Sequence, residues 1–264
     1  RINWIMMIFS LMLSGCAVKK KEVTYKERPV EVLYNEAVDA LEQKKYKDAV
    51  EKFDKVEREH PYSVWATKAQ LISAFAQYQM NNYDEALLSL ERFIQLHPAN
   101  KDIAYAYYLK ALCYYEQVSD VVRDQAMTEL AKDAFKELVM RFPNSKYARD
   151  ARLKLDLTYD HLAGKEMEIG RYYHNQRYYL AAINRFKTVV ENFQTTTHVV
   201  EALHRLTECY RSLGLVKDAQ KTAAVLGHNF PSSEWYIDSY EMLKNKNIRV
   251  VDKPEKSWYE VWKD

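Results

Sequence analysis

The chain of 264 residues is long enough for one large domain or two modest ones. Its 39 lysine and arginine residues and 37 acidic residues give a formal net charge of +2, which lacks the strongly basic footprint of a nucleic-acid-binding protein. The five glycines are too widely spaced to form a loop that cradles phosphates. Composition and charge therefore argue against binding of nucleic acids and against nucleotide binding through such a loop.

The first residues, RINWIMMIFSLMLSGC, contain one arginine followed by a short run of mostly apolar residues. This run is too short to span a bilayer as a stable helix, which needs about 20 residues, so residues 1–15 are predicted to be a secretory signal peptide. The final four residues, Leu13 to Cys16, resemble the lipobox of bacterial lipoproteins. The resemblance implies cleavage before Cys16, a thioether from Cys16 to diacylglycerol and acylation of the new N-terminus. It also implies an outer-membrane location, because Ala17 replaces the aspartate that retains lipoproteins at the inner membrane.

The segment after the lipobox, AVKKKEVTYKERPV, is charged and lacks helical periodicity. Residues 16–30 are therefore predicted to be a lipidated N-terminus followed by a tether. Three consecutive lysines, Lys19 to Lys21, could contact lipid headgroups, although a solvated linker is the simpler interpretation.

A sequence pattern that begins at Tyr46, YKDAVEKFDKVEREHP, returns four more times in weaker form. It has alanine at plus three, apolar residues at plus seven and plus ten, and proline at plus fifteen, which Gln194 replaces in the fourth copy. Steps of three, four and three place these side chains on one face of a helix, and the proline ends the helix. The copies begin at Tyr46, Tyr83, Thr128, Tyr179 and Val216.

Each copy needs a preceding partner helix, because a small alanine at plus three lets a neighbouring helix approach closely. Before the fifth copy, Leu203, Leu206 and Tyr210 have the spacing of the first helix of a tetratricopeptide repeat. The chain thus resembles a tetratricopeptide-repeat protein. The predicted fold class is all-α, a tetratricopeptide-repeat solenoid of five helix pairs with a C-terminal capping helix.

The middle repeats are longer than the others. Successive copies start 37, 45, 51 and 37 residues apart, against a family period of about 34. Residues 116–127 hold the extra length of the third repeat. In the fourth, apolar residues keep one helical phase from about 146 to 176, which predicts a helix roughly 45 Å long.

The C-terminal part is predicted to begin with a closing helix over SSEWYIDSYEMLKNK, which has a serine suited to an N-cap. The tail, residues 247–264, is largely aperiodic and ends in Trp258, Tyr259 and Trp262. Docking of these aromatics on the solenoid and docking on a partner are both open interpretations.

No arrangement of residue types in the chain indicates catalysis or metal binding. Cys113 and Cys209 lie two repeats apart on apolar helices and are interpreted as buried thiols. His198 and His204 are six residues apart, so they point to different faces of a helix and do not form a His-x-x-x-His metal pair. Nucleophile elbows and cysteine zinc motifs are absent from the sequence. We therefore expect no enzyme, no catalytic residue, no metal and no cofactor other than the covalent lipid on Cys16.

The lipobox, five repeats, enlarged middle repeats and long helix together resemble the BamD (ComL/YfiO) family of outer membrane protein assembly factors. Residues 135–193 and 90–112 carry the closest local similarity, and the resemblance covers roughly residues 13–230. It implies a non-enzymatic lipoprotein on the periplasmic face of the cell outer membrane. Such a protein is a subunit of the Bam complex, which folds β-barrel proteins and inserts them into that membrane.

The resemblance also implies two protein-binding regions. Residues 31–98, repeats 1 and 2, would form a groove for unfolded β-barrel proteins. Residues 99–246, repeats 3 to 5 with the capping helix, would bind the POTRA domains of BamA, and other Bam subunits are further partners. Arg185 falls where the family has an arginine facing BamA, and its guanidinium suits bidentate binding of a carboxylate. The candidate groove residues are Tyr62, Trp65, Tyr78 and Tyr105.

A competing hypothesis is a tetratricopeptide lipoprotein that acts as a scaffold for cell-wall or pilus assembly. It uses the same lipid anchor and the same solenoid. The identity of the partner separates the two hypotheses.

Overall fold

The structure is a computed structural model that describes residues 28–244, and these residues form eleven helices and no strand. The predicted signal peptide, Cys16, nearly all of the tether and the aromatic tail 247–264 lie outside the described residues. The helices are α2 (Val30–Glu42), α3 (Tyr46–Glu59), α4 (Val64–Gln79), α5 (Tyr83–Leu96), α6 (Ile103–Tyr115), α7 (Ala126–Arg141), α8 (Ala148–Asn175), α9 (Tyr179–Asn192), α10 (His198–Ser212), α11 (Val216–Asn229) and α12 (Glu234–Leu243).

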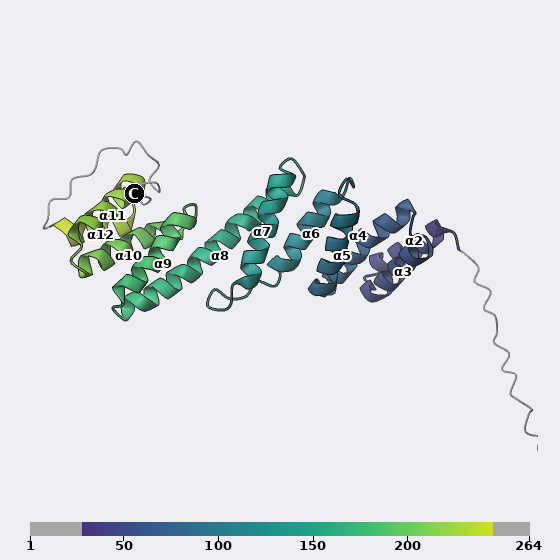
Figure 1. The fold of residues 1–264 in the computed structure, drawn as a ribbon, viewed down its shortest axis with the longest axis horizontal. Coiled ribbons are helices and arrows are strands. Elements are labelled where there is room, and N and C mark those ends of the chain that lie inside the picture. The colour runs from purple at the N-terminus through teal and green to yellow at the C-terminus, as the bar shows by residue number, and fades with distance from the viewer. Residues whose placement is uncertain (1–27, 245–264) are drawn as a thin grey trace, which may run out of the picture.

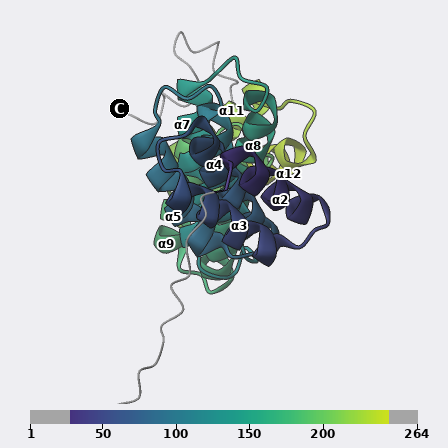
Figure 2. The same cartoon turned by 90° about the vertical axis from the view of Figure 1, so that its right-hand side faces the viewer.

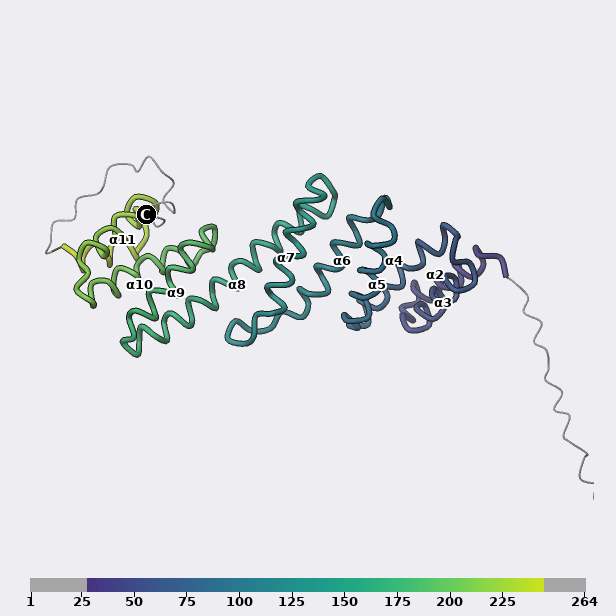
Figure 3. The backbone as a smooth tube through the Cα atoms, viewed as in Figure 1, coloured from purple at the N-terminus to yellow at the C-terminus, as the bar shows by residue number. Residues whose placement is uncertain are grey.

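The helices stack in chain order into an elongated row. Each helix from α2 to α11 packs mainly against the helices before and after it in sequence, and α12 packs against α10 and α11. Figures 1 and 3 show the row running from α2 to α11, and Figure 2 shows it from the end near α2. Packing between neighbours alone is the property of a solenoid. The predicted all-α solenoid of five helix pairs with a capping helix is confirmed.

The repeated alanine and the apolar residue after it form the core of the solenoid. A buried alanine leaves room for the partner helix, and the bulky side chain one turn later fills the space beside it. The core is divided into four clusters along the row, and α8 belongs to two of them, through Ala151 in one and Met167 in the other. The plus-three alanines Ala49, Ala86, Ala131, Ala182 and Ala219 are all 0% exposed.

Four of the five helix pairs turn through a residue with positive φ that lies two positions before the second helix begins. Three of these are not glycine: Lys44, Asn81 and Arg177, with φ of 58°, 60° and 62°. The fourth is Gly214, with φ of 76°. Glycine and asparagine adopt this left-handed conformation readily, but it is costly for other side chains. At Lys44 and Arg177 the turn is therefore set by the packing of the two helices rather than by local preference.

The two enlarged repeats differ in where their extra residues go. The third repeat has an irregular insert, residues 116–125, between α6 and α7. The fourth lengthens α8 to 28 residues, about 42 Å. The insert contacts this helix, because Lys165 Nζ donates to the carbonyl oxygen of Val122 at 2.7 Å.

The start of α12 differs in one detail from the sequence prediction. Ser233 is its N-cap residue, but its side chain accepts no capping hydrogen bond. The helix is instead held by its buried face, where Leu243 and Ser239 are 3% and 0% exposed.

Candidate interaction surfaces

The position of Arg185 on α9 depends on a close approach of α8 to α9. Its neighbour Phe186 is fully buried and lies directly over Gly170 of α8. A Cβ atom at Gly170 would stand 2.4 Å from the Phe186 ring, so only glycine permits this separation of the two helices. The close approach brings Glu166, one turn before Gly170, next to Arg185.

Arg185 and Glu166 form an ion pair at the surface. Arg185 Nη1 lies 3.1 Å and 3.3 Å from the two carboxylate oxygens of Glu166. The Arg185 side chain is 42% exposed, whereas that of Glu166 is 19% exposed. A partly exposed pair of this kind adds only about 0–1 kcal/mol to stability. Its main effect is to orient the guanidinium while leaving much of it accessible.

A second surface, here called the tyrosine surface, consists of four half-buried tyrosines, three on the first helices of the second and third repeats and one just before the first helix of the fourth. Two of its members donate their hydroxyls to carboxylates: Tyr78 of α4 to Glu116 at 3.3 Å, and Tyr108 of α6 to Asp150 of α8 at 2.5 Å. The Tyr147 ring lies 5.3 Å from that of Tyr105 and 5.1 Å from that of Tyr108. The surface comprises Tyr78, Tyr105, Tyr108 and Tyr147.

Burial raises the pKa of three of these four phenols above its ordinary value. It raises the pKa of Tyr105 to about 12, with a smaller contribution from Tyr147. Burial also raises the pKa of Tyr78 and of Tyr108, and the carboxylates of Glu116 and Asp150 raise them further. The hydroxyls of Tyr78 and Tyr108 thus remain donors to these carboxylates well above neutral pH.

The four tyrosine and tryptophan residues that the sequence suggested for the groove do not share one cluster. Tyr78 and Tyr105 pack against the same core cluster. Trp65 belongs to the preceding cluster, where its ring lies 4.7 Å from that of Tyr34 and 4.8 Å from Lys68 Nζ. Tyr62 precedes α4 and is fully exposed. The assignment of these residues to a substrate groove stays a prediction.

Sequence reasoning missed three residues of these two surfaces. Tyr108 follows Tyr105 by three residues, so helical spacing was a signal that the two share a face. Tyr147 precedes the first residue of α8, and only the folding of the chain through α7 brings it to Tyr105 of α6. No local sequence pattern indicated that Glu166 contacts Arg185, because it lies nineteen residues before Arg185 and on another helix.

The cysteines and acidic residues show no reactive arrangement in the described part of the chain. Cys113 and Cys209 are buried, as the sequence indicated, and burial raises the pKa of each thiol to about 12, far from the range of a reactive thiolate. Within residues 28–244 no group of three or more His, Cys, Asp and Glu residues is placed to hold a metal ion. None of the helices described is both long enough and apolar enough to cross a membrane.

Comparison with known proteins gives consistent matches over most of the chain. A family described as YfiO, outer membrane lipoprotein, matches residues 26–226. A relative from Caulobacter vibrioides is 49% identical over 93% of this chain and 81% of its own length. A relative from Rickettsia prowazekii is 49% identical over 91% of this chain and 95% of its own length. A relative from Neisseria meningitidis is 37% identical over 96% of this chain and 96% of its own length. All three are outer membrane protein assembly factors named BamD.

Solved structures give a weaker match. A tetratricopeptide repeat protein from Parabacteroides merdae is 17% identical over 81% of this chain and 73% of its own, with a TM-score of 0.42.

Proposed function

Because the chain belongs to the YfiO family of outer membrane lipoproteins, whose similar members are outer membrane protein assembly factors, we propose that it is a non-enzymatic subunit of the β-barrel assembly complex. In this role it binds the POTRA domains of BamA through its C-terminal repeats and receives unfolded β-barrel proteins on its N-terminal repeats. Family membership favours this role over a scaffold for cell-wall or pilus assembly.

The proposed contact with BamA is supported mainly by the exposure and orientation of the Arg185 guanidinium. It is partly exposed on α9 and is oriented from one side by Glu166. Its remaining N–H groups are suited to a partner carboxylate, which a planar guanidinium binds through two parallel hydrogen bonds. A lysine provides the charge without this geometry.

The test is the affinity of the purified chain for the BamA POTRA domains. Arg185→Glu is expected to weaken binding at least tenfold, because it places a carboxylate against a partner carboxylate. Arg185→Lys should cause a smaller loss. Arg58→Glu on α3 is the matched control, since it makes the same charge change at an exposed position outside repeats 3 to 5. Equal affinities of Arg185→Glu and the control would reject the contact.

The tyrosine surface supports the proposed reception of unfolded substrate. Half-buried tyrosines provide apolar contact area at low cost in conformational entropy, together with a hydroxyl for hydrogen bonding. Such a surface suits an extended, partly apolar segment of a protein that has not yet folded. Tyr62 and Trp65 would extend the contact toward the first repeat.

Lipid attachment at Cys16 is the remaining part of the proposal, and it is supported by the lipobox and by the description of the matching family. Several acyl chains hold a protein stably at a membrane, whereas one binds only marginally. Confinement at the membrane raises the effective concentration of each partner, so individual contacts need not be strong. Cys16→Ala should release the protein from the outer membrane fraction, and unchanged fractionation would reject the anchor.

A further inference from the structure

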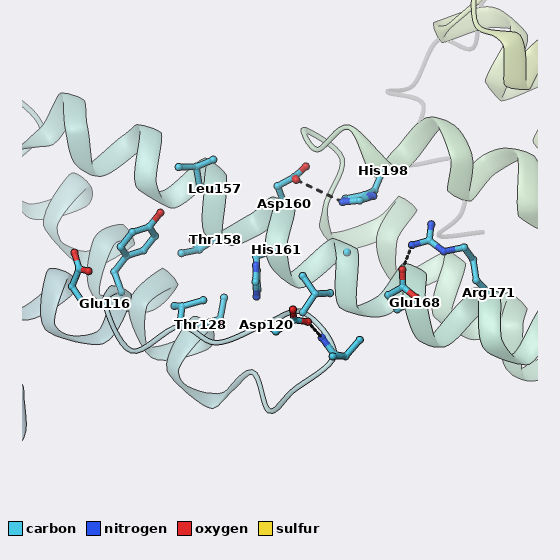
Figure 4. A pocket seen from close by; sticks show the side chains of 15 residues that line it. Glu116, Asp120, Thr128, Leu157, Thr158, Asp160, His161, Glu168, Arg171 and His198 are labelled. Atoms are coloured by element: carbon cyan, nitrogen blue, oxygen red, sulfur yellow. Dashed lines mark hydrogen bonds and ion pairs between the residues drawn. The ribbon is translucent and has the colours of Figure 1, made fainter.

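The insert of the third repeat and the middle of α8 enclose a cleft that neither proposed binding surface uses. Its volume is about 660 Å³. Residues 116–122 line one side, α8 lines the opposite side, and His198, the first residue of α10, closes one end. Figure 4 shows the side chains of these three repeats facing a common space.

The rim of the cleft carries exposed apolar side chains. Leu157 of α8 is 56% exposed and Val122 of the insert is 65% exposed. Both line the cleft. An apolar rim of this kind suits the methylene stem of a long charged side chain.

The lining of the cleft is acidic, and three of its four acidic residues are exposed. Four carboxylates line it, and its single guanidinium, Arg171, is already shared between Glu168 and Glu201. Asp120 accepts the backbone N–H of Val122 at 3.0 Å, and Asp160 accepts from Thr197 Oγ1 at 3.0 Å. These two donors are neutral. Asp160 also lies 3.6 Å from Nε2 of His198, which forms an ion pair with it only when the histidine is protonated. The carboxylates belong to Glu116, Asp120, Asp160 and Glu168.

A histidine in the cleft has an unused hydrogen-bonding atom. Nε2 of His161 is buried and has no hydrogen-bond partner among the described residues. Figure 4 shows the ring pointing from α8 toward the insert. Buried polar atoms are nearly always hydrogen-bonded, so this nitrogen is suited to a group that the chain does not supply, either a water molecule or a polar group of a partner.

We propose that this cleft binds an arginine side chain presented on a surface loop of a partner protein. The stem lies between Leu157 and Val122, and the guanidinium faces Asp120, Asp160 and His161. Arginine fits better than lysine, because its five N–H groups in a rigid fork can serve several acceptors at once. The inference rests on the cleft alone and is independent of the proposed contact of Arg185.

The direct test uses the full chain and three short probes: acetyl-Ala-Arg-Ala-amide, its citrulline analogue and its lysine analogue. Citrulline keeps the shape of arginine and removes the charge. Ring signals of His161 and His198, followed by nuclear magnetic resonance, report binding. We expect saturable binding of the arginine peptide, binding of the citrulline peptide at least tenfold weaker, and an intermediate affinity for the lysine peptide. Equal affinities for arginine and citrulline, or no saturable binding of the arginine peptide, would overturn the proposal.

Variants locate the site. Asp120→Asn combined with Asp160→Asn keeps both hydrogen-bond acceptors and should weaken the arginine peptide at least tenfold. Asp238→Asn, an exposed position on α12 outside the cleft, makes a charge change of the same type and should leave binding unchanged. Circular dichroism checks that each variant is folded. Equal affinity of the double variant and the control would contradict binding in this cleft.

Discussion

In the proposed contact with BamA, Glu166 orients the side chain of Arg185 before the partner binds. The carboxylate holds one nitrogen of the guanidinium and thereby limits the rotamers that Arg185 explores before binding. Ordering a long side chain costs roughly 0.5–1.5 kcal/mol at an interface. A side chain that is already oriented avoids part of this cost.

Glu166→Ala is therefore expected to weaken binding to the BamA POTRA domains several-fold while changing the free energy of unfolding by less than about 1 kcal/mol. Affinity measured for the single variants and for the double variant with Arg185→Ala forms a double-mutant cycle. If Glu166 acts through Arg185, its replacement has no further effect in the Arg185→Ala background. An increase in affinity on Glu166→Ala would instead mean that Glu166 competes with the partner carboxylate.

Gly170 governs the stability of the same region. Gly170→Ala places a methyl group 2.4 Å from the Phe186 ring, so α8 and α9 must separate, at a cost of about 1–3 kcal/mol. Gly164→Ala on the same helix is the control. Its Cβ meets only the His198 and Val121 side chains at 3.4 Å and beyond, and alanine favours the helix by up to about 1 kcal/mol. Urea unfolding should show a loss for the first variant and no loss for the second.

At the scale of elements, one buried polar contact ties the capping helix α12 to α10, and a cluster of charged groups on α10 lies beside it. His204 of α10 is 4% exposed and lies 2.8 Å from Ser239 Oγ of α12. One turn along α10, Glu208 lies 2.7 Å from Arg205 Nη1 and 3.6 Å from His204 Nε2. Burial alone would raise the pKa of Glu208, but hydrogen bonds from His204 and Arg205 lower it to about 2.

This lowered pKa gives a stability contribution with a defined pH dependence. The usual pKa of a glutamate is 4.5, so ionised Glu208 stabilises the folded state above pH 4.5, and this contribution is lost as the pH falls toward about 2. Wild type should exceed Glu208→Gln in unfolding free energy at pH 6, and the difference should shrink at pH 4 and pH 3. Glu241→Gln, at an exposed position on α12, controls for loss of a surface carboxylate. A difference that does not change with pH would contradict this account.

The helices were predictable from the sequence because their signals are local. The buried alanine of each copy, such as Ala49, is followed one turn later by a core side chain, and every copy became the second helix of a pair. The left-handed turns at Lys44 and Arg177 were not predictable, because neither residue prefers positive φ. The cleft under the insert was not predictable either. It exists only because residues distant in the chain, such as Val122 and Lys165, meet in the fold.

At the scale of the whole molecule, α8 joins two halves of the solenoid. Its first turns belong to the core cluster of the third repeat, through Ala151, and its later turns to the cluster of the fourth and fifth, through Ala163 and Met167. In a solenoid each repeat is stabilised by its neighbours. Cooperativity between the two halves therefore depends on this one helix.

Asp156→Pro tests this dependence. Asp156 is exposed on α8, and proline in a helix interior removes a hydrogen bond and clashes with the preceding turn, at a cost of about 3 kcal/mol or more. Calorimetry should then show two unfolding transitions where the wild-type chain shows one. Asp156→Ala removes the same carboxylate without breaking the helix and should keep a single transition. A single transition in Asp156→Pro as well would mean that α8 does not couple the halves.

The length of the continuous helix α8 also fixes the distance between the tyrosine surface and Arg185. Tyr147 at one end belongs to the tyrosine surface, and Glu166 holds Arg185 nineteen residues further on, a span of about 28 Å. Lengthening α8 by one residue would turn one surface relative to the other by about 100°, whereas one whole turn would move it about 5.4 Å along the axis and nearly keep its direction. The number of residues in this helix thus sets both the distance and the relative orientation of the two proposed binding surfaces, one for an unfolded chain and one for a POTRA domain.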